Sequence, residues 1–330
     1  MLNYRLNVAM GTDIGIRRDH NEDAIGYHYP DDFGTLTTKG VLLIIADGVG
    51  SLAKGEEASH YAVDRLIELY YQDDSEASIH NSLKTCLEKV NSEVFFKFDG
   101  HSATTIVAVV ICQSEVITAY VGDSRSYLFD SKSVRQHTTD HVRSFDVGNK
   151  RRKTKLTRAI GHNHSVNIDI LDAQLDVGHG VLLLTDGATP YFSEDDLCSM
   201  MMRKKPSAIV TDIIQYSNRG GGLDNISAIV LSVEGVLEDE TALRQHINQL
   251  PDEVKVDYAT RLRQPIVIPQ PRPEQFFLFS MVVLLSMIIG LLFYIQITKQ
   301  DISASITQIP ALSTLVPYET PYNLTVTPLP

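Results

Sequence analysis

The sequence of 330 residues predicts an α+β domain in which two sheets are covered by helices on their outer sides. Short apolar runs typical of buried strands occur in clusters, and pairs of segments with helical spacing interrupt these clusters. Two of the apolar runs, at residues 42–50 (LLIIADGVG) and 182–187 (LLLTDG), reach an Asp followed by Gly. Because glycine permits a tight turn, this ending is expected to place a carboxylate at the edge of a core.

The first half of the chain alternates strands with one pair of helices. The helices follow from apolar residues at helical spacing, such as Ala58, Ala62 and Leu66 in the first of them. The predicted elements are, in order, a strand over 5–10, a charged loop over 11–23, the strand leading to Asp47, helices over 55–71 and 78–98, and strands over 104–112, 116–121 and 126–129.

The second half repeats this pattern. Ser193, followed by three acids, is expected to cap the first of two further helices. The predicted elements are a basic loop over 150–158, strands over 166–175, 181–185 and 226–233, and helices over 193–203, 207–216 and, less regularly, 237–250. Asp32-Phe33-Gly34 is interpreted as a turn, because no other part of a kinase signature accompanies it.

Composition limits the classes of function. The net charge of −12 argues against a nucleic-acid-binding surface. Cys86, Cys112 and Cys198 are odd in number and widely spaced, so neither a disulfide framework nor a zinc site is expected. The first residues lack the features of a signal peptide. We therefore expect most of the chain to lie in the cytosol.

Residues 276–297 predict a membrane anchor. These 22 residues contain no charged side chain. As a helix they would span roughly 33 Å, enough for a hydrocarbon core of about 30 Å. Positive residues are more frequent before this segment than after it, which places the amino-terminal domain in the cytoplasm and the C-terminus outside. The predicted organisation is a catalytic domain over 1–235, a juxtamembrane connector over 236–275, a transmembrane helix over 276–297 and a short extracytoplasmic tail over 298–330, expected to be disordered.

Five aspartates form the candidate site. Each is expected in a turn beside a strand, at positions Asp23, Asp47, Asp123, Asp186 and Asp224. Carboxylates without His or Cys partners suit Mg²⁺ or Mn²⁺ better than zinc. Arg17 or Arg18, in the segment GIRRDHNED, could hold a phosphoryl group beside such ions. The residue types alone therefore favour metal-assisted hydrolysis of a phosphoester.

The order of seven sequence blocks resembles the protein phosphatase 2C family, the metal-dependent serine/threonine phosphatases of bacterial type. The blocks lie within residues 4–233 and read GIRRDHNED, ADGVGSLAKGEEAS, ATTIVAV, VGDSR, LTRAIG, LLLTDG and GGGLDN. The resemblance implies a four-layer α-β-β-α sandwich of two antiparallel sheets flanked by helix pairs, with the metals at one end.

The resemblance also implies a role for each site residue. Asp47 would bridge two Mn²⁺ or Mg²⁺ ions, the carbonyl of Gly48 would bind one of them, and Asp186 and Asp224 would bind the other. Asp23 and Glu22 would hold metal-bound waters, and Asp123 would bind a third, weaker ion. Arg18 would bind the phosphate. A hydroxide bridging the metals would attack phosphoserine or phosphothreonine in line. The expected partners are phosphorylated proteins and, by family analogy, a serine/threonine kinase and its targets. The alternative is a catalytically weak phosphatase-like module that only binds phosphopeptides.

The basic cluster at residues 150–155 suggests a substrate preference. We hypothesise that it favours acidic phosphopeptides, because its cations would attract carboxylates near the phosphate. Neutralising the cluster should lower kcat/KM for acidic phosphopeptides more than for p-nitrophenyl phosphate. Equal effects on both substrates would contradict the hypothesis.

Overall fold

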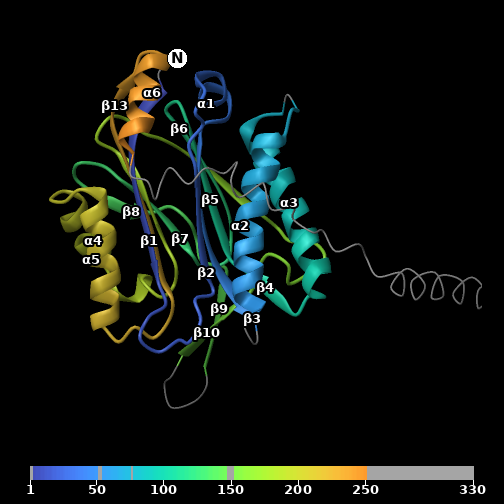
Figure 1. Cartoon of the computed structure of the whole chain (residues 1–330). Helices are drawn as coiled ribbons and strands as arrows, with labels where there is room; N and C mark the ends of the chain where they lie inside the picture. Colours follow the sequence, from blue (N-terminus) through green and yellow to red (C-terminus); the bar gives the residue numbers. More distant parts are fainter. Residues whose placement is uncertain (1–2, 51–53, 76, 147–151, 251–330) are drawn as a thin grey trace, which may run out of the picture. The chain divides into compact units, whose positions relative to one another are not determined.

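Two antiparallel sheets pack face to face, and a pair of helices covers the outer side of each (Figure 1). The computed structural model describes residues 3–50, 54–75, 77–146 and 152–250, all within the first of two units of the chain, Met1–Val267. The predicted four-layer sandwich is confirmed. The predicted transmembrane helix and tail lie outside the described residues. Among the helices of the described residues, none is long and apolar enough to cross a bilayer.

The first sheet has the strand order β11-β6-β5-β3-β2, and β4 pairs with the end of β3. Its strands are β2 (Asp23–His28), β3 (Val41–Gly50), β4 (Ser102–Thr104), β5 (Ile106–Cys112), β6 (Glu115–Val121) and β11 (Asp169–Gln174). All seven residues of β5 are buried. A central strand covered on both faces explains why its sequence is a continuous apolar run.

The second sheet has the order β1-β13-β12-β7-β8. Its strands are β1 (Asn3–Asp13), β13 (Ile226–Leu237), β12 (Gly180–Leu184), β7 (Arg125–Phe129) and β8 (Val134–Gln136). The first and last strands of the domain pair along their whole length, from Asn3↔Leu237 to Asp13↔Ile226. This pairing brings the segment that follows β1 next to the segment that precedes β13.

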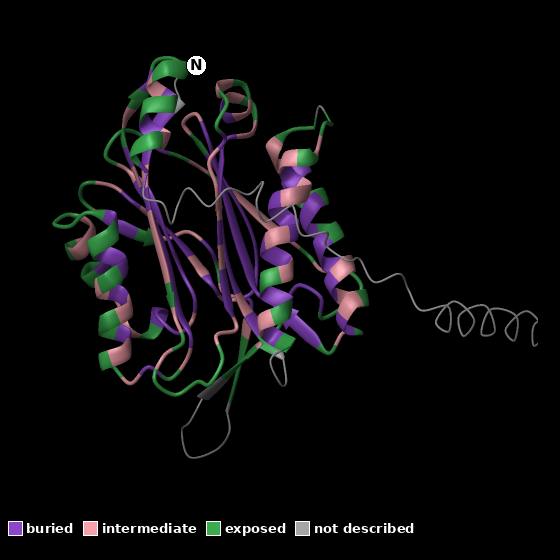
Figure 2. Ribbon diagram, viewed as in Figure 1, coloured by how far each residue is buried: buried purple, intermediate pink, exposed green. Residues whose placement is uncertain are grey.

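Two helix pairs complete the layers. The helices α2 (Lys54–Gln72) and α3 (Ile79–Phe98) cover the first sheet, and α4 (Glu194–Met201) and α5 (Pro206–Arg219) cover the second. Ser193 caps α4 as predicted, in a capping box with Asp196. Buried residues line the facing surfaces of the sheets and the inner sides of the helices (Figure 2). They form three apolar layers, represented by Leu66 on the inner side of α2, Leu183 between the sheets and Ile213 on the inner side of α5.

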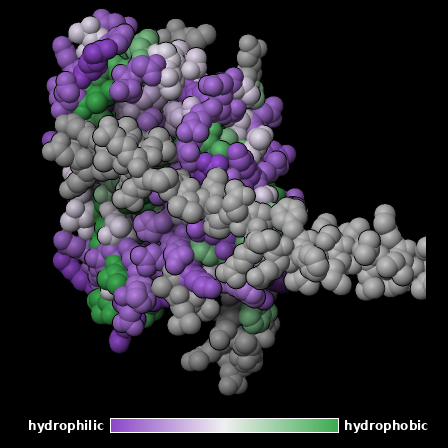
Figure 3. All heavy atoms as spheres, turned by 45° about the vertical axis from the view of Figure 1, so that its right-hand side comes forward, coloured by the Kyte–Doolittle hydropathy of each residue, from purple (hydrophilic) through white to green (hydrophobic). Residues whose placement is uncertain are grey.

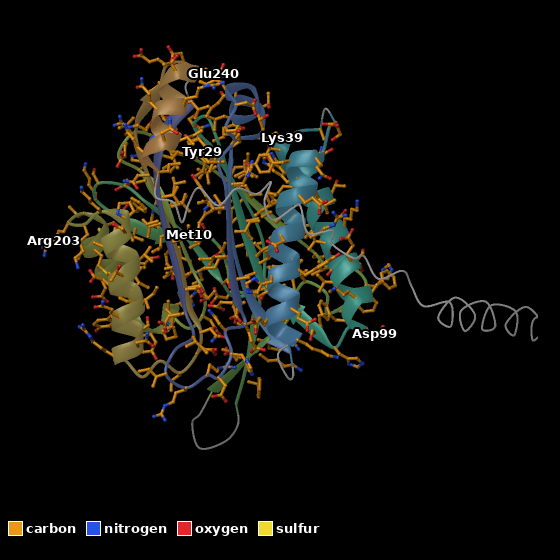
Figure 4. The ribbon with its side chains drawn as sticks, viewed as in Figure 1. Met10, Tyr29, Lys39, Asp99, Arg203 and Glu240 are labelled. Atoms are coloured by element: carbon orange, nitrogen blue, oxygen red, sulfur yellow. The ribbon has the colours of Figure 1, made fainter. Side chains whose placement is uncertain are left out.

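Asp32-Phe33-Gly34 begins a helix and is not the predicted turn. The helix α1 (Phe33–Lys39) starts where the Asp32 carboxylate accepts a hydrogen bond of 2.7 Å from the backbone N–H of Thr35. Lys39, labelled in Figure 4, lies near the end of α2 and donates to the carbonyl of Tyr70 at 2.9 Å. The sequence pattern was misread because an Asp that caps a helix also favours a turn.

The basic segment contains a strand in place of the predicted loop. The strands β9 (Val142–Asp146) and β10 (Arg152–Leu156) form a two-stranded hairpin in which Lys155 lies opposite Arg143. Both of these residues are exposed. Water solvates their charges, and the backbone N–H and C=O groups of the two strands form hydrogen bonds with each other. A charged sequence can therefore form this hairpin. Residues 147–151, which include one end of the basic cluster, lie outside the described residues.

The folded layers continue beyond residue 235. The strand β13 ends at Leu237, and the helix α6 (Glu240–Gln249) follows within the predicted helical segment. Leu243 is fully buried, and His246 Nε2 lies 2.8 Å from the carbonyl oxygen of Leu6 in β1. The short helix η1 (Thr189–Tyr191) completes the described elements.

Candidate active site

The predicted site residues gather at the end of the sandwich where β3 ends, which is also the end from which the β9–β10 hairpin projects (Figure 1). They come from the β1–β2 loop, from β2 and β3, and from the segments that follow β6 and β12 and precede β13. Asp23 begins β2 and is the register partner of Asp47 in β3. Residues that are far apart in sequence thus meet because antiparallel pairing places these strand ends together.

Asp47 lies inside β3 and not in a turn after it. The strand continues because Gly48 to Gly50 pair with Ser102 to Thr104 of β4. The backbone N–H of Asp47 donates to Thr105 Oγ1 at 2.9 Å, and its carbonyl accepts from Thr104 Oγ1 at 2.9 Å. The Asp-Gly pair therefore marks a change of partner from β5 to β4, which local sequence does not reveal.

Gly48 is required by a close approach of two backbones. A Cβ at this position would come within 2.3 Å of the carbonyl oxygen of Gly55 at the start of α2. The N–H of Gly48 donates to the carbonyl of Glu22 at 3.0 Å. These contacts hold the Glu22–Asp23 segment against the end of β3.

Asp23 links the two sheets at this end. It is buried, and its Oδ2 accepts hydrogen bonds from Thr185 Oγ1 at 2.8 Å and from Ser227 Oγ at 2.7 Å. Its Oδ1 is buried and has no hydrogen-bond partner among the described residues. Burial raises the pKa of Asp23 to about 7, and the negative charges of Asp186 and Asp224 add to this shift.

The other acids show the same electrostatic crowding. Burial, followed by the charges of Asp23, Asp186 and Asp224, raises the pKa of Asp47 well above its usual range. Burial, together with the charge of Asp224, also raises the pKa of Asp186. Burial and the charge of Asp186 raise the pKa of Asp123 to about 6. Positive charge near the cluster would favour its full ionisation.

Arg18 supplies one such charge at the mouth of the cluster. Its Nη2 donates to Asp224 Oδ2 at 2.7 Å, and its Nη1 lies 3.6 Å from Glu22 Oε2. The Arg18 side chain is 42% exposed, so the guanidinium is held by acids and is still open to solvent. Arg17, its neighbour, is also exposed.

Asn225 has a structural role that the sequence did not reveal. Its Nδ2 donates to the carbonyls of Ile14 and His20, and its Oδ1 accepts from the N–H of Glu22, each at 2.8 Å. Asn225 therefore holds the whole β1–β2 loop against the segment that carries Asp224. The only signal in the sequence was its place directly after Asp224 in GGGLDN.

The structure thus brings the predicted residues to one end of the sandwich, but their side chains are not arranged as a set of metal ligands. Within residues 3–250, apart from the short gaps, no three His, Cys, Asp or Glu side chains are close enough together to hold an ion as they stand. Hydrogen bonds and ion pairs instead engage several of the acids, such as Asp23 with Thr185 and Ser227 and Asp224 with Arg18.

Comparisons with known proteins give the family. The model of the family described as protein phosphatase 2C matches residues 17–220. The serine/threonine phosphatase stp of Listeria innocua is 31% identical over 247 residues, which cover 68% of this chain and 95% of that protein. Protein phosphatase PhpP of Streptococcus pneumoniae is 26% identical over 246 residues, covering 69% and 98% of the two chains.

Solved structures agree with this result. A serine/threonine phosphatase from S. agalactiae has a TM-score of 0.61 at 27% identity and covers 69% of this chain and 100% of its own. The serine/threonine phosphatase Stp1 from Staphylococcus aureus has a TM-score of 0.60 at 25% identity, with coverage of 70% and 96%. Because the family model matches more than half of the chain's length, the chain belongs to the protein phosphatase 2C family.

Proposed function

We propose that this chain is a metal-dependent protein phosphatase that hydrolyses phosphoserine and phosphothreonine in proteins. The observation that carries the proposal is a set of mutually repelling carboxyls, buried at Asp23 and half-buried at the other aspartates, beside a half-exposed arginine at one end of the fold. The names of the relatives from Listeria innocua and Streptococcus pneumoniae support the same reaction.

The donor set fits Mn²⁺ or Mg²⁺. Carboxylate and carbonyl oxygens are the preferred ligands of these ions, and the partnerless Oδ1 of Asp23 is a buried acceptor without a donor in the described chain. Two ions would be held by Asp47, the carbonyl of Gly48, Asp186 and Asp224; Asp23 and Glu22 would act through water, and Asp123 would contribute to a third, weaker site. When bound, such ions supply positive charge to the phosphoryl oxygens and activate the attacking water for an in-line displacement.

The chain's own residues bind and orient the substrate. The Arg18 guanidinium presents a planar fork of donors that matches two phosphoryl oxygens. Its contacts with Asp224 and Glu22 fix its direction before substrate arrives, which reduces the conformational entropy lost on binding. Asp23, through Thr185 and Ser227, keeps the acids of the two sheets in register.

Metal removal tests the proposal. The full-length protein should hydrolyse a phosphothreonine peptide with Mn²⁺ or Mg²⁺ present and should lose this activity in EDTA, because the ions supply the missing positive charge. Re-addition of Mn²⁺ is the control for irreversible damage. If the metal-loaded protein binds the peptide without hydrolysing it, the chain is the phosphopeptide-binding module, and the proposal is wrong.

We further propose that the reaction takes place at the cytoplasmic face of a membrane, with residues 276–297 as a single-pass anchor. The charge-free length of this segment and the arginines before it support this arrangement. A phosphatase held there would act on phosphoproteins at the same surface, including a serine/threonine kinase and its targets. Recovery of the full-length protein in the soluble fraction of lysed cells would contradict the anchor.

A further inference from the structure

Several exposed apolar side chains lie in the segments that form the candidate site. Among the described residues, ten large hydrophobic side chains are exposed, and four of them belong to segments that carry predicted site residues: Ile14, Ile16, Val49 and Leu223. Where Figure 3 is coloured, the face that it draws is mostly hydrophilic, with a few separate hydrophobic patches. Single exposed hydrophobic residues are ordinary, whereas a group of them beside a site indicates contact with a ligand.

Ile16 and Leu223 lie beside the same turn. The N–H groups of Ile16 and Arg17 both donate to the carbonyl of Gly222, at 2.9 and 3.0 Å. A Cβ on Gly222 would come within 2.9 Å of Ile16 Cγ1, and a Cβ on Gly221 would lie 3.7 Å from Leu223 Cγ. Both apolar side chains therefore border the Gly221–Gly222 turn, one from each of two loops that are bonded together.

This turn is firmly held and yet presents apolar surface to solvent. Asn225 secures the loop of Ile16 through the carbonyls of Ile14 and His20. Ile16 and Leu223 are nevertheless 64% and 66% exposed. Because the backbone that carries them is held in this way, the two side chains can bind a partner without an ordering of the loops.

The places of Ile16 and Leu223 in the chain relative to Arg18 point to the occupant. Ile16 precedes Arg18 by two residues, and Leu223 directly precedes Asp224, whose carboxylate accepts a hydrogen bond of 2.7 Å from Arg18. A phosphoryl group on Arg18 would therefore place a neighbouring residue of the same peptide over Ile16 and Leu223. The carboxylates of Glu22 and Asp224 beside this surface would repel an acidic residue there.

We propose that Ile16 and Leu223 form an apolar subsite for a large aliphatic side chain next to the phosphorylated residue. The proposal rests on the proposed phosphatase function and names a class of substrate for it: phosphopeptides with Leu, Ile or Val beside the phosphoserine or phosphothreonine. It is separate from the hypothesis that the basic cluster at residues 150–155 favours acidic phosphopeptides.

The test compares phosphothreonine peptides that differ at one flanking residue. Full-length protein with Mn²⁺ is given peptides with Leu or Ser directly before, or directly after, the phosphothreonine, and kcat/KM is measured for each. The Leu peptide should be preferred about tenfold over the Ser peptide on one of the two sides, the size of effect expected from burying one aliphatic side chain in a partly open subsite. The ratio is the readout, since it is independent of the total activity of each preparation.

Variants connect this ratio to the two residues. In Ile16→Ser with Leu223→Ser the ratio should fall to about one to two, with intermediate values for the single variants, because each removes one apolar wall. Val177→Ser is the matched control: Val177 is 54% exposed but lies in the connection between β11 and β12, and the ratio should stay near ten. Thermal unfolding verifies that each variant is folded.

Three outcomes overturn the subsite. A Leu-to-Ser ratio near one on both sides, in a protein that hydrolyses p-nitrophenyl phosphate with Mn²⁺, removes the subsite and leaves the phosphatase function intact. A preference for Leu that survives the double substitution assigns it to other residues. Absence of hydrolysis of every substrate contradicts the proposed function itself, and the subsite falls with it.

Discussion

Asp47→Asn should lower kcat for a phosphothreonine peptide by about a thousandfold or more in the full-length protein at saturating Mn²⁺. Asp47 is proposed to hold both ions, so its loss would remove several kcal/mol of charge stabilisation. The substitution keeps the shape of the side chain and removes its charge. It also keeps the backbone bonds to Thr104 and Thr105, which hold this part of β3. Steady-state hydrolysis measures the rate, and calorimetric titration with Mn²⁺ should show weaker binding.

Asp195→Asn is the control for this result. Asp195 is exposed in the first turn of α4 and is not among the predicted site residues, so its replacement should change kcat by less than about twofold. If Asp47→Asn retains more than a tenth of the activity and binds Mn²⁺ as tightly as the unmodified protein, Asp47 does not hold the ions, and the proposed site is wrong.

Arg18→Ala should lower kcat/KM about a hundredfold to a thousandfold for peptides and for p-nitrophenyl phosphate alike, because both substrates present the same phosphoryl group to the guanidinium. Arg18→Lys should recover only part of this loss, since an ammonium keeps the charge without the planar fork. Initial rates at substrate concentrations far below KM give the ratio directly.

The neighbouring arginine provides a matched comparison. Arg17 is exposed, whereas the contacts to Asp224 and Glu22 come from Arg18. Arg17→Ala should therefore change kcat/KM for p-nitrophenyl phosphate by only a few fold. If Arg17→Ala is the more damaging of the two substitutions, Arg17 binds the phosphate, and the role proposed for Arg18 is wrong.

The arrangement of layers could be predicted from the sequence because its signals are local. Apolar runs such as the one that became β5 mark strands covered on both faces, and the spacing of Ala58, Ala62 and Leu66 marks a helix with one buried side. The β9–β10 hairpin was missed for the corresponding reason: its sequence is charged, and its stability depends on pairing between two segments.

In the site, too, features with a local sequence signal could be predicted, whereas features that depend on remote contacts could not. The five aspartates stood out because each follows or precedes an apolar run, and the family resemblance assigned roles to them. The position of Asp47 within β3 and the function of Asn225 depend on contacts with residues remote in sequence, such as Thr105 and Ile14. Hydrogen bonds between distant segments leave no periodic pattern, so only the structure reveals them.

The crowding of carboxyls at the site would also affect how long the protein survives in a cell, if a cation binds there as proposed. Repulsion among Asp23, Asp47 and Asp186 opposes folding, and a cation that binds only the folded chain offsets it. An ion present at about a hundred times its Kd adds roughly 2.7 kcal/mol to the free energy of unfolding, which lowers the unfolded population available to proteases by about a hundredfold. The supply of divalent cations would thus set the abundance of this enzyme as well as its rate.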